Sequence, residues 1–89
     1  MRLSTRARYG LRLILEVGRN HKKSPVYLKD IANKIDVSEK YLSQIILPLK
    51  ASGIIANFKG AHSGYILAKP PEDIDMLSVI NSLEGDMQS

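Results

Sequence analysis

The sequence contains no cysteine. This absence excludes disulfide bonds, thiolate metal sites, cysteine catalysis and an iron–sulfur cluster bound by cysteines of these 89 residues. Long apolar runs are also missing, because stretches such as Leu13-Ile14-Leu15 fall far short of the roughly 20 residues that span a bilayer. The first residues show neither the apolar stretch nor the small-residue cleavage site of a signal peptide, and we therefore expect a cytoplasmic protein.

Patterns of catalysis and metal binding are absent as well. The sequence has no nucleophile elbow, phosphate loop or carboxylate pair at a catalytic spacing, and we predict no enzyme activity. Its two histidines, His21 and His62, are too few for a metal site, and His21 stands in a polar stretch typical of a solvated loop. We expect no bound metal.

What the chain does contain is an uneven distribution of charge. Its 89 residues are enough for one small domain with a single core, and 44% of them are hydrophobic. All 13 Lys and Arg lie within residues 1–69 together with four acids, a net charge of +9, whereas residues 70–89 hold five acids and no base, a net charge of −5. The basic part favours a polyanionic partner such as nucleic acid, although a solvated basic surface would give the same composition.

Residues 5–19 are predicted to form the first helix, because apolar residues recur at spacings of three and four. The predicted apolar stripe consists of Ala7, Leu11, Ile14, Leu15 and Gly18. Ser4 or Thr5 can cap the start of this helix by accepting a backbone N–H bond.

Four arginines crowd the start of this predicted helix, namely Arg2, Arg6, Arg8 and Arg12. Positive charge is unfavourable there, because the N-terminal end of a helix dipole prefers acids. Contact with phosphate groups is the simplest reason for such a cluster, and a solvated face is the alternative.

A helix-turn-helix is predicted in the middle of the chain. Residues 28–35 form a short helix, and Asp36-Val37 breaks its pattern. Ser38 is a good N-cap for a second helix over residues 39–52, which Gly53 ends with a left-handed cap.

The second of these helices has two different faces when its residues are placed 100° apart. The core face consists of Leu42, Ile45, Ile46 and Leu49. The nearly opposite face consists of Lys40, Ser43, Gln44 and Leu47. Lysine, serine and glutamine in a row suit the base edges of a major groove, although an ordinary amphipathic helix shows a similar stripe. Leu47 is unusual on such a face and could touch a thymine methyl group or a protein partner.

A β-hairpin and a last helix complete the predicted domain. Residues 54–58 and 65–68 are rich in strand formers, and the basic, glycine-containing loop 59–64 between them suits a wing that lies on DNA. The final helix covers residues 75–83, with Asp75 as its cap. Its predicted apolar face consists of Met76, Leu77, Ile80 and Leu83. We place the domain boundary at residue 85 and expect residues 86–89 to fray.

This order of elements is that of a winged helix-turn-helix, a mainly α fold with a small β-hairpin. Three blocks of the sequence are more specific still: MRLSTRARYGLRLILEV, PVYLKDIANKIDVSEKYLSQIILPLKASGII, and KGAHSGYILAKPPEDI followed by a helix ending in LEG. Together they resemble the bacterial family that includes the iron–sulfur cluster regulator, the nitric-oxide-sensing repressor and the cysteine-metabolism repressor. The resemblance covers essentially all 89 residues without gaps. It implies a homodimeric transcription regulator, usually a repressor, that binds double-stranded DNA at a two-fold operator.

The resemblance also implies roles for individual residues. Base reading in the major groove falls to Ser38, Lys40, Ser43 and Gln44. The wing at the minor groove corresponds to Lys59, Gly60, Ala61, His62, Ser63 and Gly64. Contact with the DNA backbone falls to Arg2, Ser4, Thr5 and Tyr9, to which the arginine cluster adds Arg6 and Arg8.

The chain departs from the family pattern at several points. The wing begins with Lys59 where arginine is common, and lysine is a poorer probe of the minor groove because its ammonium group is more strongly hydrated. Ser43 stands where some members carry glutamate, so the target sequence cannot be transferred. The family's dimerisation helix and cysteine ligands lie beyond the position of Ser89. We therefore expect no cofactor in these residues, and a homodimer where that helix is present or replaced.

One other class of function fits the same fold. Some winged helices bind proteins rather than DNA, and Leu47 together with Tyr41 could form an apolar contact patch for such a partner. The concentration of every Lys and Arg before residue 70 argues against this alternative.

Overall fold

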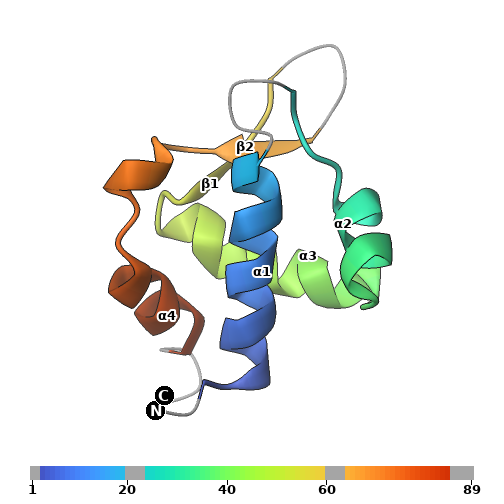
Figure 1. Cartoon of the computed structure of the whole chain (residues 1–89), viewed down its shortest axis with the longest axis horizontal. Coiled ribbons are helices and arrows are strands. Elements are labelled where there is room, and N and C mark those ends of the chain that lie inside the picture. Colours follow the sequence, from blue (N-terminus) through green and yellow to red (C-terminus); the bar gives the residue numbers. More distant parts are fainter. Residues whose placement is uncertain (1–2, 20–23, 60–63, 85–89) are drawn as a thin grey trace.

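A computed structural model of the chain describes residues 3–19, 24–59 and 64–84 (Figure 1). The elements run in the order α1 (Thr5–Arg19), α2 (Leu28–Ile35), α3 (Glu39–Ala51), β1 (Ile55–Asn57), β2 (Tyr65–Leu67), a 3₁₀ turn η1 (Pro71–Asp73) and α4 (Met76–Glu84). The predicted fold class, mainly α with a small antiparallel hairpin, is confirmed. Each predicted helix is present with ends that agree to within one residue, whereas η1 was not foreseen.

The predicted caps fix where three of the helices begin. Ser4 Oγ accepts the Ala7 backbone N–H at 3.0 Å at the start of α1, and Ser38 Oγ accepts the Tyr41 N–H at 3.0 Å at the start of α3. Asp75 accepts the Leu77 N–H at 3.2 Å at the start of α4. Each cap satisfies a donor that the helix itself cannot, which stabilises the helix by about 1 kcal/mol.

The turn between α2 and α3 depends on Asp36, which adopts a left-handed conformation with φ of 60°. Aspartate tolerates this conformation better than most residues. The backbone N–H groups of Asp36 and Val37 both bond to the carbonyl of Ala32, which closes the last turn of α2. Gly53, with φ of 74°, plays the predicted role after α3, and the Ile54 N–H then bonds back to the Leu49 carbonyl at 2.9 Å.

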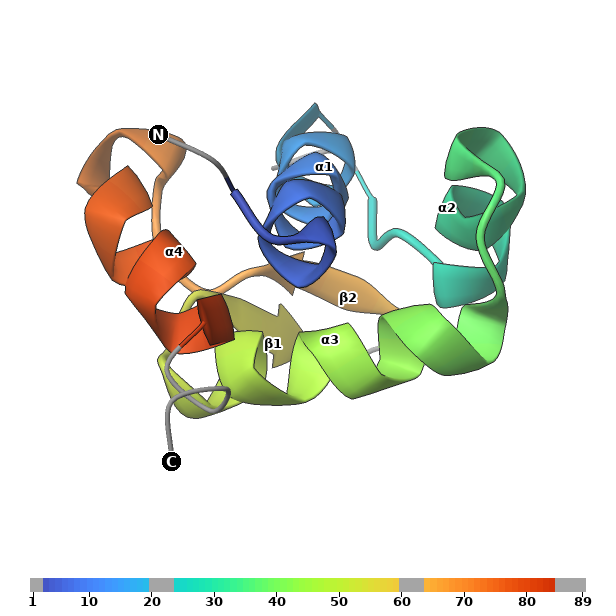
Figure 2. The ribbon, with the colours of Figure 1, turned by 90° about the horizontal axis from the view of Figure 1, so that it is seen from below.

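The core lies between α1 and α3, and α2, α4 and the hairpin close it on the remaining sides. All four residues of the predicted core face of α3 are buried: Leu42, Ile45, Ile46 and Leu49. Figure 2 shows that α1, α2 and α4 all lie on one side of α3 and leave its other side uncovered.

The buried face of α1 differs from the predicted stripe. Leu15 is 56% exposed and Leu11 is only half-buried, whereas Leu13 and Val17 are buried. Ala7 and Ile14 of the predicted stripe are buried, so the prediction was right for these two and wrong for Leu15. Contacts with α3, α4 and β2 decide which of the many apolar residues of α1 are covered. Gly10 is also buried, and a Cβ atom there would collide with Leu83 Cδ1, so the glycine permits the close approach of α4.

The predicted apolar face of α4 is likewise only partly buried. Val79 and Leu83 are fully buried and Ile80 is half-buried, but Met76 and Leu77 are 46% and 59% exposed. The packing of α4 against α1 and α3 uses the second and third turns of the helix, so the first turn extends beyond the core.

The hairpin pairs Ile55 with Leu67 and Asn57 with Tyr65 in antiparallel register. Its regular strands are shorter than predicted, although the Phe58 N–H still bonds to the Gly64 carbonyl at 2.9 Å. Val26 adds a bridge through bonds of 2.9 and 2.8 Å to the Tyr65 backbone, which ties the segment before α2 to the hairpin. In the part of the chain that the structure describes, no helix is long and apolar enough to cross a membrane.

Candidate nucleic-acid interface

The uncovered side of α3 carries three of the four predicted base-reading residues, Lys40, Ser43 and Gln44, together with Leu47, and the fourth, Ser38, is exposed at the N-cap of the helix. Lys40, Ser43, Gln44 and Leu47 are all exposed there, opposite the buried face of the same helix. The hairpin lies along one side of α3 and the first turn of α1 along the other (Figure 1). The result is an exposed helix with a flanking element on each side. We call these the hairpin flank, formed by β1, β2 and Lys59, and the α1 flank, formed by residues 3–9.

The serines of α3 have part of their hydrogen-bonding capacity already committed. Ser43 Oγ donates to the Lys40 carbonyl at 2.7 Å, so its lone pairs remain to accept a bond from a base amine. Ser38 Oγ accepts the Tyr41 N–H, so its hydroxyl hydrogen remains to be donated. Gln44 offers both the carbonyl oxygen and the NH₂ group of its side-chain amide from an exposed position, the combination that recognises adenine N6 and N7.

An aromatic pair joins α1 to the start of α3. The rings of Tyr9 and Tyr41 are 5.9 Å apart, meet edge to face at 89°, and belong to half-buried residues. Such pairs contribute about 0.5–1.5 kcal/mol beyond the area that they bury. Tyr9 therefore holds the α1 flank against α3, a role that prediction from the sequence missed. In the sequence, the one feature that could have indicated this contact is the aromatic residue Tyr41 beside the polar face of α3.

The α1 flank presents cations and hydroxyls around the first turn of α1. Thr5 and Arg8 are exposed and line a surface hollow with Leu3 and Ser4, whereas Arg6 is half-buried. Arg2 lies outside the described residues. The Ser4 N–H donates to Glu84 Oε1 at 3.2 Å, so α4 places a carboxylate at the start of α1. This acid supplies the negative charge that the first turn of α1 lacks in its own sequence.

The hairpin flank presents Lys59, which is exposed at the end of the described part of the hairpin. Gly64 is buried at the base of the wing, where an added Cβ would come within 2.8 Å of Pro25 Cβ. Its lack of a side chain therefore allows the hairpin to pack on the segment before α2. Gly60, Ala61, His62 and Ser63, the centre of the predicted wing, lie outside the described residues.

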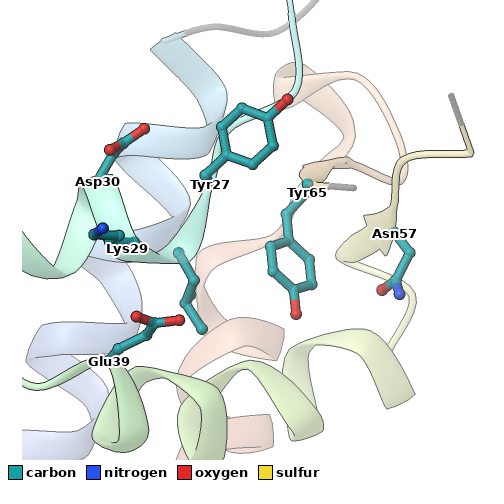
Figure 3. Close-up of a pocket in the computed structure, with 8 residues that line it drawn as sticks. Tyr27, Lys29, Asp30, Glu39, Asn57 and Tyr65 are labelled. Atoms are coloured by element: carbon teal, nitrogen blue, oxygen red, sulfur yellow. The ribbon is translucent and has the colours of Figure 1, made fainter. Parts of the chain in front are cut away.

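A surface pocket of about 500 Å³ lies between the start of α2, the first residue of α3 and the hairpin (Figure 3). Glu39 points from α3 toward the start of α2, and the Tyr65 hydroxyl points toward α3. Lys50 Nζ of α3 lies 6.0 Å from the centre of the Tyr65 ring. The remaining lining residues are Tyr27, Leu28, Lys29, Asp30, Asn57 and Gly64. This pocket brings two acids, Asp30 and Glu39, to the edge of a basic surface, which was not foreseen from the sequence.

Some of the basic residues lie in ion pairs away from this surface. Glu16 is only 8% exposed, and its carboxylate lies 2.9 Å from Lys34 Nζ of α2 and 4.0 Å from Arg19 of its own helix. The charges of Lys34 and Arg19 are therefore partly neutralised. The net charge of the first 69 residues overstates the positive charge that is free for a polyanion.

Comparison with known proteins agrees with the fold. A family model described as "Rrf2: Iron-dependent Transcriptional regulator" matches residues 3–89. The HTH-type transcriptional regulator CymR of Bacillus subtilis is 39% identical over 96% of the chain and 62% of its own length. Protein rrf2 of Nitratidesulfovibrio vulgaris is 43% identical over 94% of the chain and 56% of its own length. The solved structure of T. potens IscR superposes with a TM-score of 0.88 at 37% identity, over 97% of the chain and 63% of that protein.

The family's description mentions iron, and a metal ion needs a group of ligating side chains. The chain has no cysteine, and the described residues contain no group of three or more His, Cys, Asp or Glu that could hold a metal ion.

The match over nearly the whole chain, the identities of 37–43% and the shared winged-helix fold lead to one conclusion, although the chain spans only about three fifths of the length of these relatives. The chain belongs to the Rrf2 family of transcriptional regulators.

Proposed function

We propose that this chain is the DNA-reading part of a transcription regulator that recognises a specific sequence in double-stranded DNA. One observation carries the proposal, namely the exposed polar stripe of Lys40, Ser43 and Gln44 on α3 between two flanks that present cations. A major groove about 12 Å wide admits one α-helix and has a phosphate backbone on each side. The arrangement of α3 and its flanks is complementary to that shape.

Each part of the surface has a distinct task in this proposal. Gln44 reads an adenine and Ser43 accepts a bond from a base amine, whereas Lys40 meets a guanine or a phosphate. Thr5, Arg8 and the hydroxyl of Tyr9 hold one phosphate backbone. The wing, from Lys59 to Gly64, holds the other backbone and approaches the minor groove. Ser4 and Ser38 combine helix capping with a hydroxyl hydrogen that is free for phosphate.

The proposal is tested by fluorescence anisotropy on duplexes that the chain selects from a random pool, measured at salt concentrations between about 50 and 200 mM. A protein that neutralises Z phosphates loses affinity with a slope near −0.9Z in a plot of log K against log salt. Gln44→Ala should reduce the preference for the selected sequence by about 1–3 kcal/mol and leave non-specific binding unchanged. Failure to bind any duplex at low salt would contradict the proposal.

We further propose that the whole protein acts in the cytoplasm as a homodimeric repressor on a two-fold operator. Two recognition helices would then read half-sites one helical turn apart, about 34–36 Å between centres. Light scattering with and without operator DNA tests the dimer. Transcription in vitro from a promoter that overlaps the operator tests the sign of regulation, because an activator would increase the transcript.

Binding of a protein in place of DNA finds less support. The apolar patch expected for that function pairs Leu47 with Tyr41, but Tyr41 is half-buried and its ring packs on Tyr9. Leu47 is left as a single exposed apolar side chain among polar ones, which is small for a protein-binding surface.

A further inference from the structure

Leu47 is 61% exposed, more than any other large hydrophobic residue in the described part of the chain. Its neighbours one turn earlier on the same face of α3 are Ser43 and Gln44, both exposed and polar. Leu15 and Met76, which are also exposed, differ in that they line an apolar groove together with Ile14, Leu67 and Ile74. Leu47 thus stands alone on the face that we assign to base reading.

Exposure alone does not make Leu47 unusual, since single apolar residues are common on protein surfaces. What makes it unusual is its position on the polar face of α3. Residues three apart in a helix rise about 4.5 Å along the axis and lie on the same side, so Leu47 follows Gln44 on the exposed face at a spacing close to one base step of about 3.4 Å. With α3 lying along the groove, a side chain at this place faces a base edge, and leucine has no group that can bond to the polar atoms there.

We propose that Leu47 is a specificity-determining residue that contacts the C5 methyl group of a thymine in the major groove. The inference rests on the proposed function. Among the natural bases, only thymine offers an apolar group on the major-groove edge. Gln44 reads adenine, so the two residues together select neighbouring A·T pairs, with the thymine methyl about one step from the adenine that Gln44 contacts.

Replacement of thymine by deoxyuracil tests this contact, because it removes the methyl group and keeps base pairing intact. Each thymine in a duplex selected by the wild-type chain is replaced in turn, and affinity is measured by anisotropy. We expect a loss of about three- to fivefold at one thymine in each half-site, the effect of one methyl group buried against Leu47. Leu47→Ala should bind the thymine and deoxyuracil duplexes equally well, whereas Leu47→Met should keep most of the difference.

Leu15→Ala is the matched control, because Leu15 is 56% exposed but lies on α1 outside the interface. It should retain the full response to deoxyuracil. A second readout replaces the critical pair by C·G: methylation of that cytosine at C5 should restore affinity for the wild-type chain and leave Leu47→Ala unaffected. Thermal unfolding of each variant should match the wild type, since both leucines lie outside the core.

Two results would overturn the inference and leave the proposed function standing. One is sequence-specific binding with no response to deoxyuracil at any thymine. The other is a response that Leu47→Ala retains in full, which would mean that another residue touches the methyl group and would leave Leu47 free for a protein partner. Absence of binding to any duplex at low salt would instead overturn the proposed function, and this inference with it.

Discussion

The two flanks of α3 differ in how they are held and in the charge that they carry. On the α1 flank, the Tyr9–Tyr41 pair closes the contact with α3, and the acid beside it, Glu84, is bonded to the Ser4 N–H. On the hairpin flank, a pocket of about 500 Å³ remains open, and its only ring contact with α3 among the described residues is the distant approach of Lys50 to Tyr65. Two exposed acids, Asp30 and Glu39, line that pocket.

This difference indicates that the two flanks contribute differently to DNA binding in the proposed complex. The α1 flank is held against α3 in the absence of DNA, so little conformational entropy is lost when it binds a phosphate. The hairpin flank has an open pocket beside it that is lined by two acids and Lys29, so like-charge repulsion from the acids opposes its approach to DNA. The α1 flank should therefore set affinity for any duplex, and the hairpin flank should adjust it.

The largest effect is expected from Tyr41→Ala, which removes the ring that joins the α1 flank to α3. Loss of the half-buried Tyr41 ring and of its contact with Tyr9 should reduce the free energy of unfolding by about 2 kcal/mol. Urea denaturation measures the change. Tyr41→Phe keeps the ring pair and should remain close to the wild type.

A double-mutant cycle compares the two flanks directly. The coupling free energy between Tyr9 and Tyr41, measured with leucine substitutions, should be about 1 kcal/mol. The coupling between Lys50 and Tyr65 should be under about 0.5 kcal/mol, because at 6.0 Å and with Lys50 exposed the contact is at the weak end of cation–π interactions. Equal couplings would show that both flanks are held alike and would contradict the comparison.

The next effect concerns affinity for DNA. Arg8→Ala should weaken binding to selected and unrelated duplexes alike and reduce the magnitude of the salt slope by about 0.9, the loss of one neutralised phosphate. Lys59→Ala should reduce it less, because the acids beside the hairpin offset part of the lysine charge. Arg19→Ala provides a control for general charge, since Arg19 is exposed at the other end of α1, outside both flanks. A larger change for Lys59 than for Arg8 would reverse the assignment of the flanks.

The elements that form the central part of this surface could be predicted from the sequence. In α3, the buried residues and the polar residues occupy opposite sides, and Ser38 and Gly53 mark its ends, so local rules fix both its bounds and its orientation. In α1 the same method included Ala7 and Ile14, which are buried, but also Leu15, which is exposed. Leu11 and Leu15 fit the helical period as well as Leu13 and Val17 do, and only the packing of α3, α4 and β2 distinguishes them.

The contacts that define the flanks could not be predicted, because they join residues that are distant in the sequence. The Ser4 N–H bonds to Glu84, which is 80 positions away in the sequence, and the ring of Tyr9 in α1 contacts that of Tyr41 in α3. The pocket beside the hairpin exists because Gly64 packs on Pro25 and brings the hairpin next to the start of α2. No local pattern in the sequence indicates such neighbours.

The smallest effect, and the one with an unusual sign, is expected at the hairpin flank. Glu39→Gln removes an exposed negative charge from the edge of the surface that meets phosphates, so it should strengthen binding to every duplex by roughly two- to fivefold at low salt. The gain should fade as salt rises, because screening weakens exposed charges. Asp73→Asn, which neutralises another exposed acid, in η1, serves as the control and should change nothing. If Glu39→Gln instead weakened binding to the selected sequence alone, Glu39 would be accepting a bond from a cytosine amine, and the hairpin flank would then read sequence rather than adjust affinity.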